Sequence, residues 1–206
     1  MNQSNAYKIA IVILAAGESS RLGRPKQLLN IDGELLLQKT IDTVSASSAD
    51  AKILVLGAYA ADIIPQMDTK DIHTKINPHW QNGLSSSIKF GLRSTLDLAP
   101  DIEAILFTLS DQPYLNTALL DLIIQTHITS KTPIVHCRYE LSSGPPTLFH
   151  KDMFTYLKDI DSSTGAKSVI SRFSQKVAYV SFPKGSIDID TLKDLDNYIE
   201  KSNKNL

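Results

Sequence analysis

The chain has 206 residues, of which 42% are hydrophobic and 21% are charged, a balance typical of a globular domain with a packed core. Its formal net charge of −1 argues against nucleic acid or an anionic membrane surface as a partner. The single cysteine, Cys137, excludes an intramolecular disulfide and a cysteine-rich metal site, and is consistent with a cytoplasmic protein. We expect one domain over residues 1–206.

Short β-rich runs alternate with helical patterns along the chain. The first predicted strand, 8–14, is apolar but too short to cross a bilayer and lacks a cleavage site, so we predict neither an anchor nor a signal peptide. The next predicted strands cover 52–56, 104–109, 132–136 and 176–182. The predicted helices cover 35–46, 60–67, 85–97, 117–130, 151–158, 165–173 and 191–202.

Continuous apolar strands such as IAIVIL and AILFTL are typical of a sheet that is covered on both faces. Alternation of strands and helices favours parallel pairing. The sequence therefore predicts an α/β fold, a three-layer α/β/α sandwich with a mostly parallel sheet. Ligands of such sheets bind at the carboxyl ends of the strands.

The first strand leads into a loop rich in glycine, serine and basic residues, LAAGESSRLGRPKQLL at residues 14–29. A dinucleotide-binding loop would need a third glycine besides Gly17 and Gly23, and a Walker A loop would need a shorter glycine spacing followed by Lys-Ser or Lys-Thr. Two interpretations remain. Backbone N–H groups, Arg21 and Lys26 bind an anion, or the segment is an ordinary turn with solvated basic residues.

The same stretch resembles the signature of the MobA-like nucleotidyltransferases, L-A-[AG]-G-x-x-x-R-[LM]-G-x-x-K. The matching positions are Leu14, Ala15, Ala16, Gly17, Arg21, Leu22, Gly23 and Lys26. Four later segments are similar to further motifs of the family, in order: NPHWQNGLSSSIKFGL at 77–92, LSDQP at 109–113, GPPTLF at 144–149 and DIDT at 188–191. The resemblance covers most of the chain. Within the family, Ala16 and the DQP triplet are similar to the cytidylyltransferases of molybdenum-cofactor maturation.

This resemblance implies a nucleotide-diphospho-sugar transferase-like fold and transfer of CMP from CTP to the phosphate of molybdopterin, with release of pyrophosphate. It implies Mg²⁺ as cofactor, and Arg21, Lys26 and Asp111 as catalytic residues. Because the attacking phosphate is already an anion, the reaction needs charge neutralisation and alignment rather than a nucleophilic side chain. A molybdoenzyme or its chaperone is an expected partner.

Two acidic positions are candidate metal ligands. Asp111 follows a predicted strand, so its carboxylate should lie at the carboxyl end of the sheet, although an aspartate in a proline-containing turn is the alternative. Asp190 alternates with Asp188 along SIDID, which puts the two on one face of an extended segment. The alternative for Asp190 is enrichment of a helix start, since Thr191 and Asp194 have the spacing of a capping box.

The resemblance places the nucleotide along the first loop and at a predicted helix start after Asn82 and Gly83. The nucleotide-binding residues that it implies are Leu14, Ala15, Ala16, Gly17, Arg21, Lys26, Asn77, Gly83, Ser85 and Ser87. A helix N-terminus binds anions, but serine there also simply caps a helix, and the two roles are compatible. Trp80 is a core or lid residue on this interpretation.

The acceptor is expected to contact Gly144, Pro146 and Lys167. Pro145 departs from the family pattern, where His or Arg is frequent, and Lys167 could supply the missing charge or be a solvated helix residue. Two other functions remain open. One is nucleotidyl transfer to a sugar or polyol phosphate, and the other is a non-catalytic carrier of the molybdenum cofactor.

Overall fold

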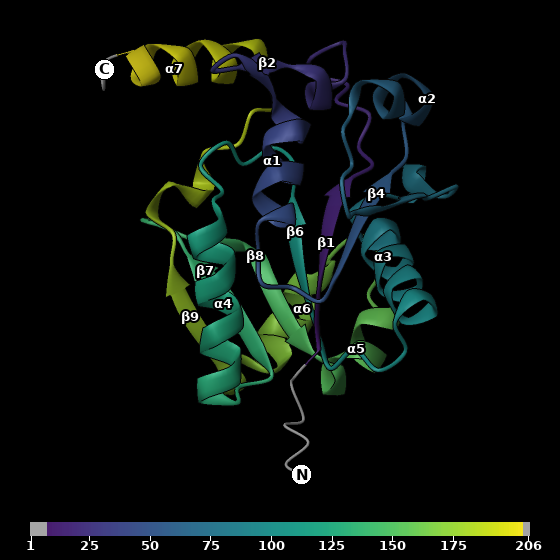
Figure 1. The fold of residues 1–206 in the computed structure, drawn as a ribbon. Helices are drawn as coiled ribbons and strands as arrows, with labels where there is room; N and C mark the ends of the chain where they lie inside the picture. Colours follow the sequence, from purple (N-terminus) through teal and green to yellow (C-terminus); the bar gives the residue numbers. More distant parts are fainter. Residues whose placement is uncertain (1–7, 204–206) are drawn as a thin grey trace.

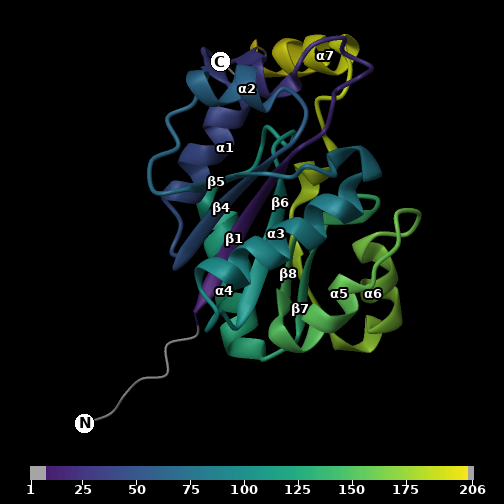
Figure 2. The same ribbon diagram turned by 90° about the vertical axis from the view of Figure 1, so that its right-hand side faces the viewer.

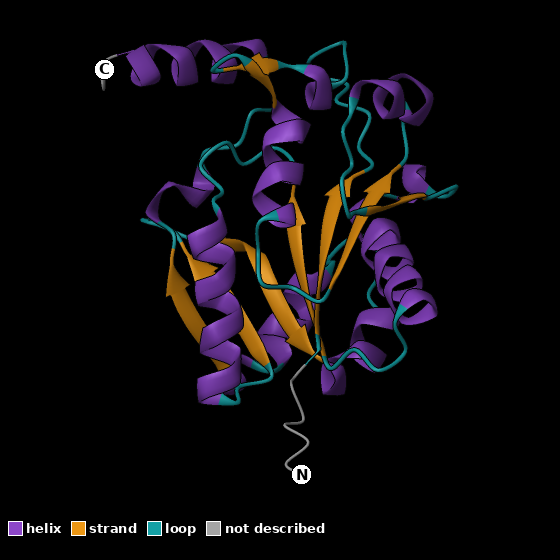
Figure 3. Cartoon of the chain, viewed as in Figure 1, coloured by secondary structure: helices purple, strands orange, loops and turns teal. Residues whose placement is uncertain are grey.

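The computed structural model describes residues 8–203, and its centre is a sheet with helices on both faces (Figure 1, Figure 3). Within these residues the main sheet has seven strands in the order β5-β4-β1-β6-β8-β7-β9. The strands are β1 (Ile9–Ala15), β4 (Ala51–Leu56), β5 (His73–Ile76), β6 (Ala104–Leu109), β7 (Ile134–Arg138), β8 (Ser143–His150) and β9 (Val177–Ser181). The α-helices are α1 (Leu36–Ser45), α2 (Ala60–Ile63), α3 (Leu84–Leu98), α4 (Thr117–Ser130), α5 (Phe154–Lys158), α6 (Ala166–Arg172) and α7 (Leu192–Asn203).

Two hydrophobic clusters fill the space between the sheet and its helical layers. Successive side chains of a strand point to opposite faces, so Ile11 and Ile13 of β1 join the cluster under α1 and α4, while Val12 joins the cluster under α3. Figure 1 shows α1 and α4 on one face, and Figure 2 shows α3, α5 and α6 on the other. The predicted three-layer α/β/α sandwich is confirmed.

The predicted strands omitted β8, which is the largest error in the predicted sheet. This strand lies between β6 and β7 and runs antiparallel to both. A proline pair normally argues against an internal strand, because proline has no N–H for the ladder. Here the register slips between His136 and Cys137, so Pro145 and Pro146 fall between the paired residues Gly144 and Thr147 as a bulge.

The edge strand β5 and a short antiparallel hairpin, β2 (Asn30–Ile31) with β3 (Glu34–Leu35), were also absent from the predicted elements. The hairpin packs against α7 through a third hydrophobic cluster that contains Ile31, Ile189 and Leu195. The Tyr198 hydroxyl donates to an Asp32 carboxylate oxygen at 2.5 Å across this contact. Figure 1 shows α7 beside β2, so the C-terminal segment is tied to the loop that follows β1.

Among residues 8–203, no helix is both long enough and apolar enough to cross a membrane. Cys137, the single cysteine of the chain, is buried in β7, and burial raises the pKa of its thiol to about 12. The predicted domain of residues 1–206 extends beyond the described residues at both ends.

Candidate active site

A buried amide anchors the loop after β1 to the end of that strand. The loop returns to the sheet in a short 3-10 helix, Lys26–Leu28, in which Gln27 is fully buried. Gln27 Nε2 donates to the carbonyl oxygens of Ala15 at 2.9 Å and Gly17 at 3.2 Å. This role of Gln27 was not predicted, since a single glutamine next to basic residues does not indicate that its side chain is buried.

Lys26 joins two carboxylates that lie far apart in the sequence. Its ammonium donates to Asp111 Oδ2 at 2.6 Å and to Asp190 Oδ1 at 2.7 Å. The side chains of Lys26 and Asp111 are only 15% and 13% exposed, so this network is shielded from water. Arg21 donates from Nη2 to Asp190 Oδ2 at 2.8 Å, but from an exposed position. The structure therefore brings the four predicted catalytic and metal-binding residues together.

The charges of this network shift the pKa of its members. Burial alone would lower the pKa of Lys26 and raise that of Asp190. The opposite charges outweigh burial: Asp111 and Asp190 raise the pKa of Lys26, and Lys26 with Arg21 lowers that of Asp190. Lys26 and Asp190 are therefore both charged at neutral pH.

Asp188 is a further acidic group that the sequence analysis did not include among the site residues. Burial, followed by repulsion from Asp111 and Asp190, raises the pKa of Asp188 to about 7. Its Oδ1 is buried without a hydrogen-bond partner in the described part of the chain. The Asp188 carboxyl group is therefore protonated more readily than that of Asp190, whose pKa is lowered by Lys26 and Arg21.

The capping box at the start of α7 forms without the Asp190 carboxylate, although the Asp190 N–H also donates to Asp194 Oδ2, at 3.2 Å. The Asp194 carboxylate accepts from the Thr191 N–H at 2.8 Å and from the Thr191 hydroxyl at 2.7 Å, and the Asp194 N–H donates back to that hydroxyl at 3.2 Å. Thr191 and Asp194 thus cap the helix, which leaves the Asp190 carboxylate to Lys26 and Arg21. The capping interpretation therefore accounts for Thr191 and Asp194, and the role of Asp190 as a metal ligand stays a prediction.

The carboxylates of Asp111 and Asp190 fit a hard divalent cation. Both carboxylates bond to the same cationic atom, Lys26 Nζ, and Asp111 Oδ1 is buried without a partner among residues 8–203. Mg²⁺ in nucleotide sites is commonly held by one or two carboxylates together with phosphate oxygens of the substrate. Within the described residues, no set of three or more acidic, histidine or cysteine side chains forms a metal cluster, so a cation here would depend on such additional ligands.

A cavity of about 300 Å³ opens between this centre and the start of α3. Seven of the predicted nucleotide-binding residues line it: Leu14, Ala15, Ala16, Gly17, Lys26, Gly83 and Ser87. Trp80 also lines the cavity, and it packs so closely that a Cβ on Gly57 would come within 2.5 Å of the Trp80 Cβ. Gly57 is thus the residue that allows the indole to lie against the sheet.

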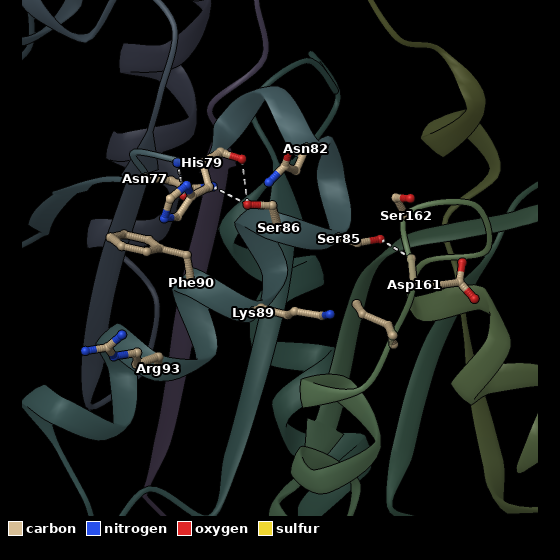
Figure 4. Close-up of a pocket in the computed structure, with 11 residues that line it drawn as sticks. Asn77, His79, Asn82, Ser85, Ser86, Lys89, Phe90, Arg93, Asp161 and Ser162 are labelled. Carbon is tan, nitrogen blue, oxygen red and sulfur yellow. Dashed lines mark hydrogen bonds between the residues drawn. The ribbon is translucent and has the colours of Figure 1, made fainter.

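Asn77 and Ser85 lie outside that cavity and support its wall. Asn77 is buried, and its side-chain amide donates to the hydroxyls of Ser86 at 3.1 Å and Ser87 at 3.2 Å. Ser85 donates to the carbonyl oxygen of Asp161 at 2.6 Å, which joins α3 to the loop before α6 (Figure 4). Asn77, Ser85 and Lys89 line a separate cavity of about 380 Å³.

A third cavity, of about 280 Å³, adjoins the first and shares Leu14, Leu84 and Leu109 with it. Gly144 and Lys167, two of the three predicted acceptor residues, line this cavity. Pro146 is buried and does not contribute to the lining, whereas its neighbour Pro145 does. We call this space the apolar cavity, because aromatic and aliphatic side chains form most of its wall.

Together, the fold and these cavities define an α/β protein with a lysine–carboxylate centre beside a cavity at the carboxyl ends of its strands. A family model, the MobA-like NTP transferase domain, matches residues 11–177. The chain therefore belongs to the MobA-like NTP transferase family, as the motifs predict, and is a nucleotidyltransferase by family. The matched range includes Lys26 and Asp111 and ends before Asp190.

Several known proteins are similar to the chain. The crystal structure of Rv0371c from Mycobacterium tuberculosis H37Rv has 30% identity and a TM-score of 0.80, and the match covers 95% of this chain and 98% of that one. A second Rv0371c structure, a complex with manganese, has 27% identity over 94% of this chain and 98% of that one, with a TM-score of 0.76.

Two curated proteins match over different lengths. Nicotine blue oxidoreductase from Paenarthrobacter nicotinovorans is 31% identical over 118 residues, which is 56% of this chain and 55% of that protein, so the match spans about half of its length. The purine catabolism protein PucB from Bacillus subtilis (strain 168) is 24% identical over 203 residues, 91% of this chain and 92% of that protein.

Proposed function

We propose that the protein transfers CMP from CTP to the phosphate of molybdenum-bound molybdopterin and releases pyrophosphate. The observation that carries this proposal is the Lys26 ammonium between Asp111 and Asp190, at the wall of a cavity that adjoins a second, apolar one. The first cavity suits a nucleotide triphosphate, and the second suits the flat, uncharged body of the acceptor. We further propose that the 206 residues form one domain that acts in the cytoplasm, with a molybdoenzyme or its chaperone as partner.

In the proposed reaction, an oxygen of the acceptor phosphate attacks the α-phosphorus of CTP. A new P–O bond forms, the bond to the β-phosphate bridging oxygen breaks, and pyrophosphate leaves with that electron pair. Lys26, Arg21 and the N–H groups of the loop after β1 neutralise the charge of the leaving group. Asp111 and Asp190 would hold Mg²⁺, which supplies further charge neutralisation when it is bound.

The lining of the apolar cavity favours this acceptor over a sugar or polyol phosphate. Phe107, Phe149 and Leu109 give part of its wall a flat apolar surface that suits a ring better than a polyol, although Ser162, Ser163 and Thr164 offer hydroxyls at another part of the wall. A non-catalytic cofactor carrier would in turn have no use for a lysine and two carboxylates beside a triphosphate-sized cavity.

Pyrophosphate release tests the proposal. The protein is incubated with Mg²⁺ and CTP, GTP or ATP, with and without the molybdenum-charged pterin, and with a panel of sugar phosphates. We expect pyrophosphate only with CTP and the pterin, loss of turnover in Asp111→Asn, and normal turnover in Asp62→Asn, which changes an exposed aspartate of α2. Release with a sugar phosphate would favour the first alternative, and cofactor binding without turnover of any NTP would favour the carrier.

A further inference from the structure

The apolar cavity contains a buried pair of polar side chains. His136 of β7 and Thr147 of β8 are directly paired across the sheet, and each is only 5% exposed. The His136 Nδ1 lies 2.7 Å from the Thr147 hydroxyl oxygen. This contact fixes the plane of the imidazole ring against the floor of the cavity.

The surroundings of the pair are aromatic on one side and charged at the opening. Phe107 and Phe149, an edge-to-face pair with ring centroids 6.3 Å apart, line the same cavity. Lys167 also lines it but is itself exposed, so its ammonium lies where the cavity meets solvent. Such a cavity suits a flat ring that carries an anionic group on one side.

The imidazole is uncharged in this setting. Burial, with a smaller effect from the positive charge of Lys167, lowers the pKa of His136 to about 4. A neutral imidazole has one donor nitrogen and one acceptor nitrogen. Since Nδ1 is used by Thr147 and Nε2 has no hydrogen-bond partner among residues 8–203, Nε2 is available to a molecule in the cavity.

We infer that His136, oriented by Thr147, is the residue that selects the acceptor, by a hydrogen bond between its Nε2 and the edge of a heteroaromatic ring in the apolar cavity. The inference rests on the proposed function for the identity of the reaction, and it assigns to His136 the preference for a phosphate ester of a flat nitrogen heterocycle as acceptor. The phosphate of this acceptor would reach the nucleotide cavity along the wall that the two cavities share, Leu14, Leu84 and Leu109. A polyol phosphate has no flat ring to pack against Phe107 and Phe149 and so does not hold one hydrogen-bonding edge against Nε2, and such a mismatch reduces affinity.

Equilibrium binding to the full-length protein tests this inference. The probes are 6-hydroxymethylpterin phosphate, glycerol 3-phosphate and CTP with Mg²⁺. His136→Phe keeps a ring of similar size but removes the hydrogen bond. His127→Phe is the matched control, because His127 is an equally buried histidine that lies on α4, under the opposite face of the sheet.

We expect His136→Phe to weaken binding of the pterin phosphate about tenfold while the affinities for glycerol 3-phosphate and CTP are unchanged. Thr147→Val, which removes only the orienting hydroxyl, should weaken pterin phosphate binding about threefold. This variant replaces His136→Phe in the test if His136→Phe does not fold. A role in folding alone would weaken all three ligands to the same extent.

Unchanged pterin phosphate affinity in either folded variant, or an equal loss for all three probes, would overturn the inference. If the wild-type protein turns over CTP with the pterin and His136→Phe does so with the same KM, the inference is wrong and the proposed function stands. If pterin phosphate binding depends on His136 but no NTP is turned over, the inference stands and the proposed function is wrong.

Discussion

Replacing Lys26 with methionine keeps the length of the side chain and removes the cation that two carboxylates share. In the wild-type protein, Lys26 Nζ lies 2.6 Å from Asp111 and 2.7 Å from Asp190. Without it, Asp111 is left mostly buried with no cationic partner among residues 8–203, where Asp190 keeps only the exposed Arg21. The substitution therefore leaves like charges close together with little water to screen them.

The size of the effect follows from burial. Removing one member of a fully buried ion pair costs about 3–5 kcal/mol of unfolding free energy. Since the Asp190 side chain is 33% exposed and Asp111 only 13%, solvent relieves part of the cost, and we expect about 2–3 kcal/mol. For a chain of this size, such a loss lowers Tm by roughly 4–12 °C.

The assay is thermal unfolding in excess EDTA and again with MnCl₂. The matched control is Lys70→Met, which removes a lysine from a surface pair with Asp42 at 3.0 Å and should cost less than about 1 kcal/mol. Because Lys26→Met frees both carboxylates, manganese should raise its Tm more than that of the wild-type protein. Equal stability of the two variants, with equal responses to metal, would refute the view that Lys26 holds this pair of carboxylates.

Three further substitutions test other parts of the molecule. Gly185→Ala places a Cβ inside the rings of Tyr139 and Phe182, so it should lower the unfolding free energy by about 1–3 kcal/mol in urea titrations, and full stability would contradict that packing. The folded-state pKa of Asp188, about 7, lies above its unfolded value. The free energy of unfolding of the wild-type protein should therefore decrease as the pH is raised from about 4 to about 7 in the absence of metal. Asp188→Asn should flatten this decline in unfolding curves measured across that range. Arg21→Met should change Tm by only a few degrees, because the side chain is 69% exposed, yet raise the KM for CTP about tenfold in the pyrophosphate assay.

The strands with an unbroken apolar sequence were predictable, because a run of apolar residues is by itself the signal for a strand that is buried on both faces of the sheet. Ile9–Ala15 and Ala104–Leu109 are of this kind, and once the second is a strand, Asp111 must follow at its carboxyl end. The antiparallel β8 could not be predicted in this way. Its two prolines oppose strand formation locally, and only the slipped register with β7 makes them compatible with the sheet.

The approach of Asp190 to Lys26 is a second feature that local patterns cannot give. The two residues are 164 positions apart, and they meet because Ile189 is buried in the cluster that joins the β2–β3 hairpin to α7. The side chain of Ser85 shows the same limitation at shorter range. A serine at a helix start predicts capping or anion binding, yet its hydroxyl bonds to Asp161 in a distant loop.

The position of Lys26 also bears on how its site would work under the proposed function. Its ammonium is engaged by Asp111 and Asp190, so it must release at least one carboxylate to contact a triphosphate. The backbone beneath it is fixed, since the Lys26 N–H donates to the Ser19 hydroxyl and Gln27 is anchored to β1, so the flexible four-carbon stem is the part that moves. A lysine suits this exchange better than an arginine, whose rigid planar fork would hold a carboxylate through two parallel bonds. The carboxylates that are released are then the ones available to a divalent cation, so the same lysine that stabilises the empty site would yield its ligands when nucleotide and metal bind together.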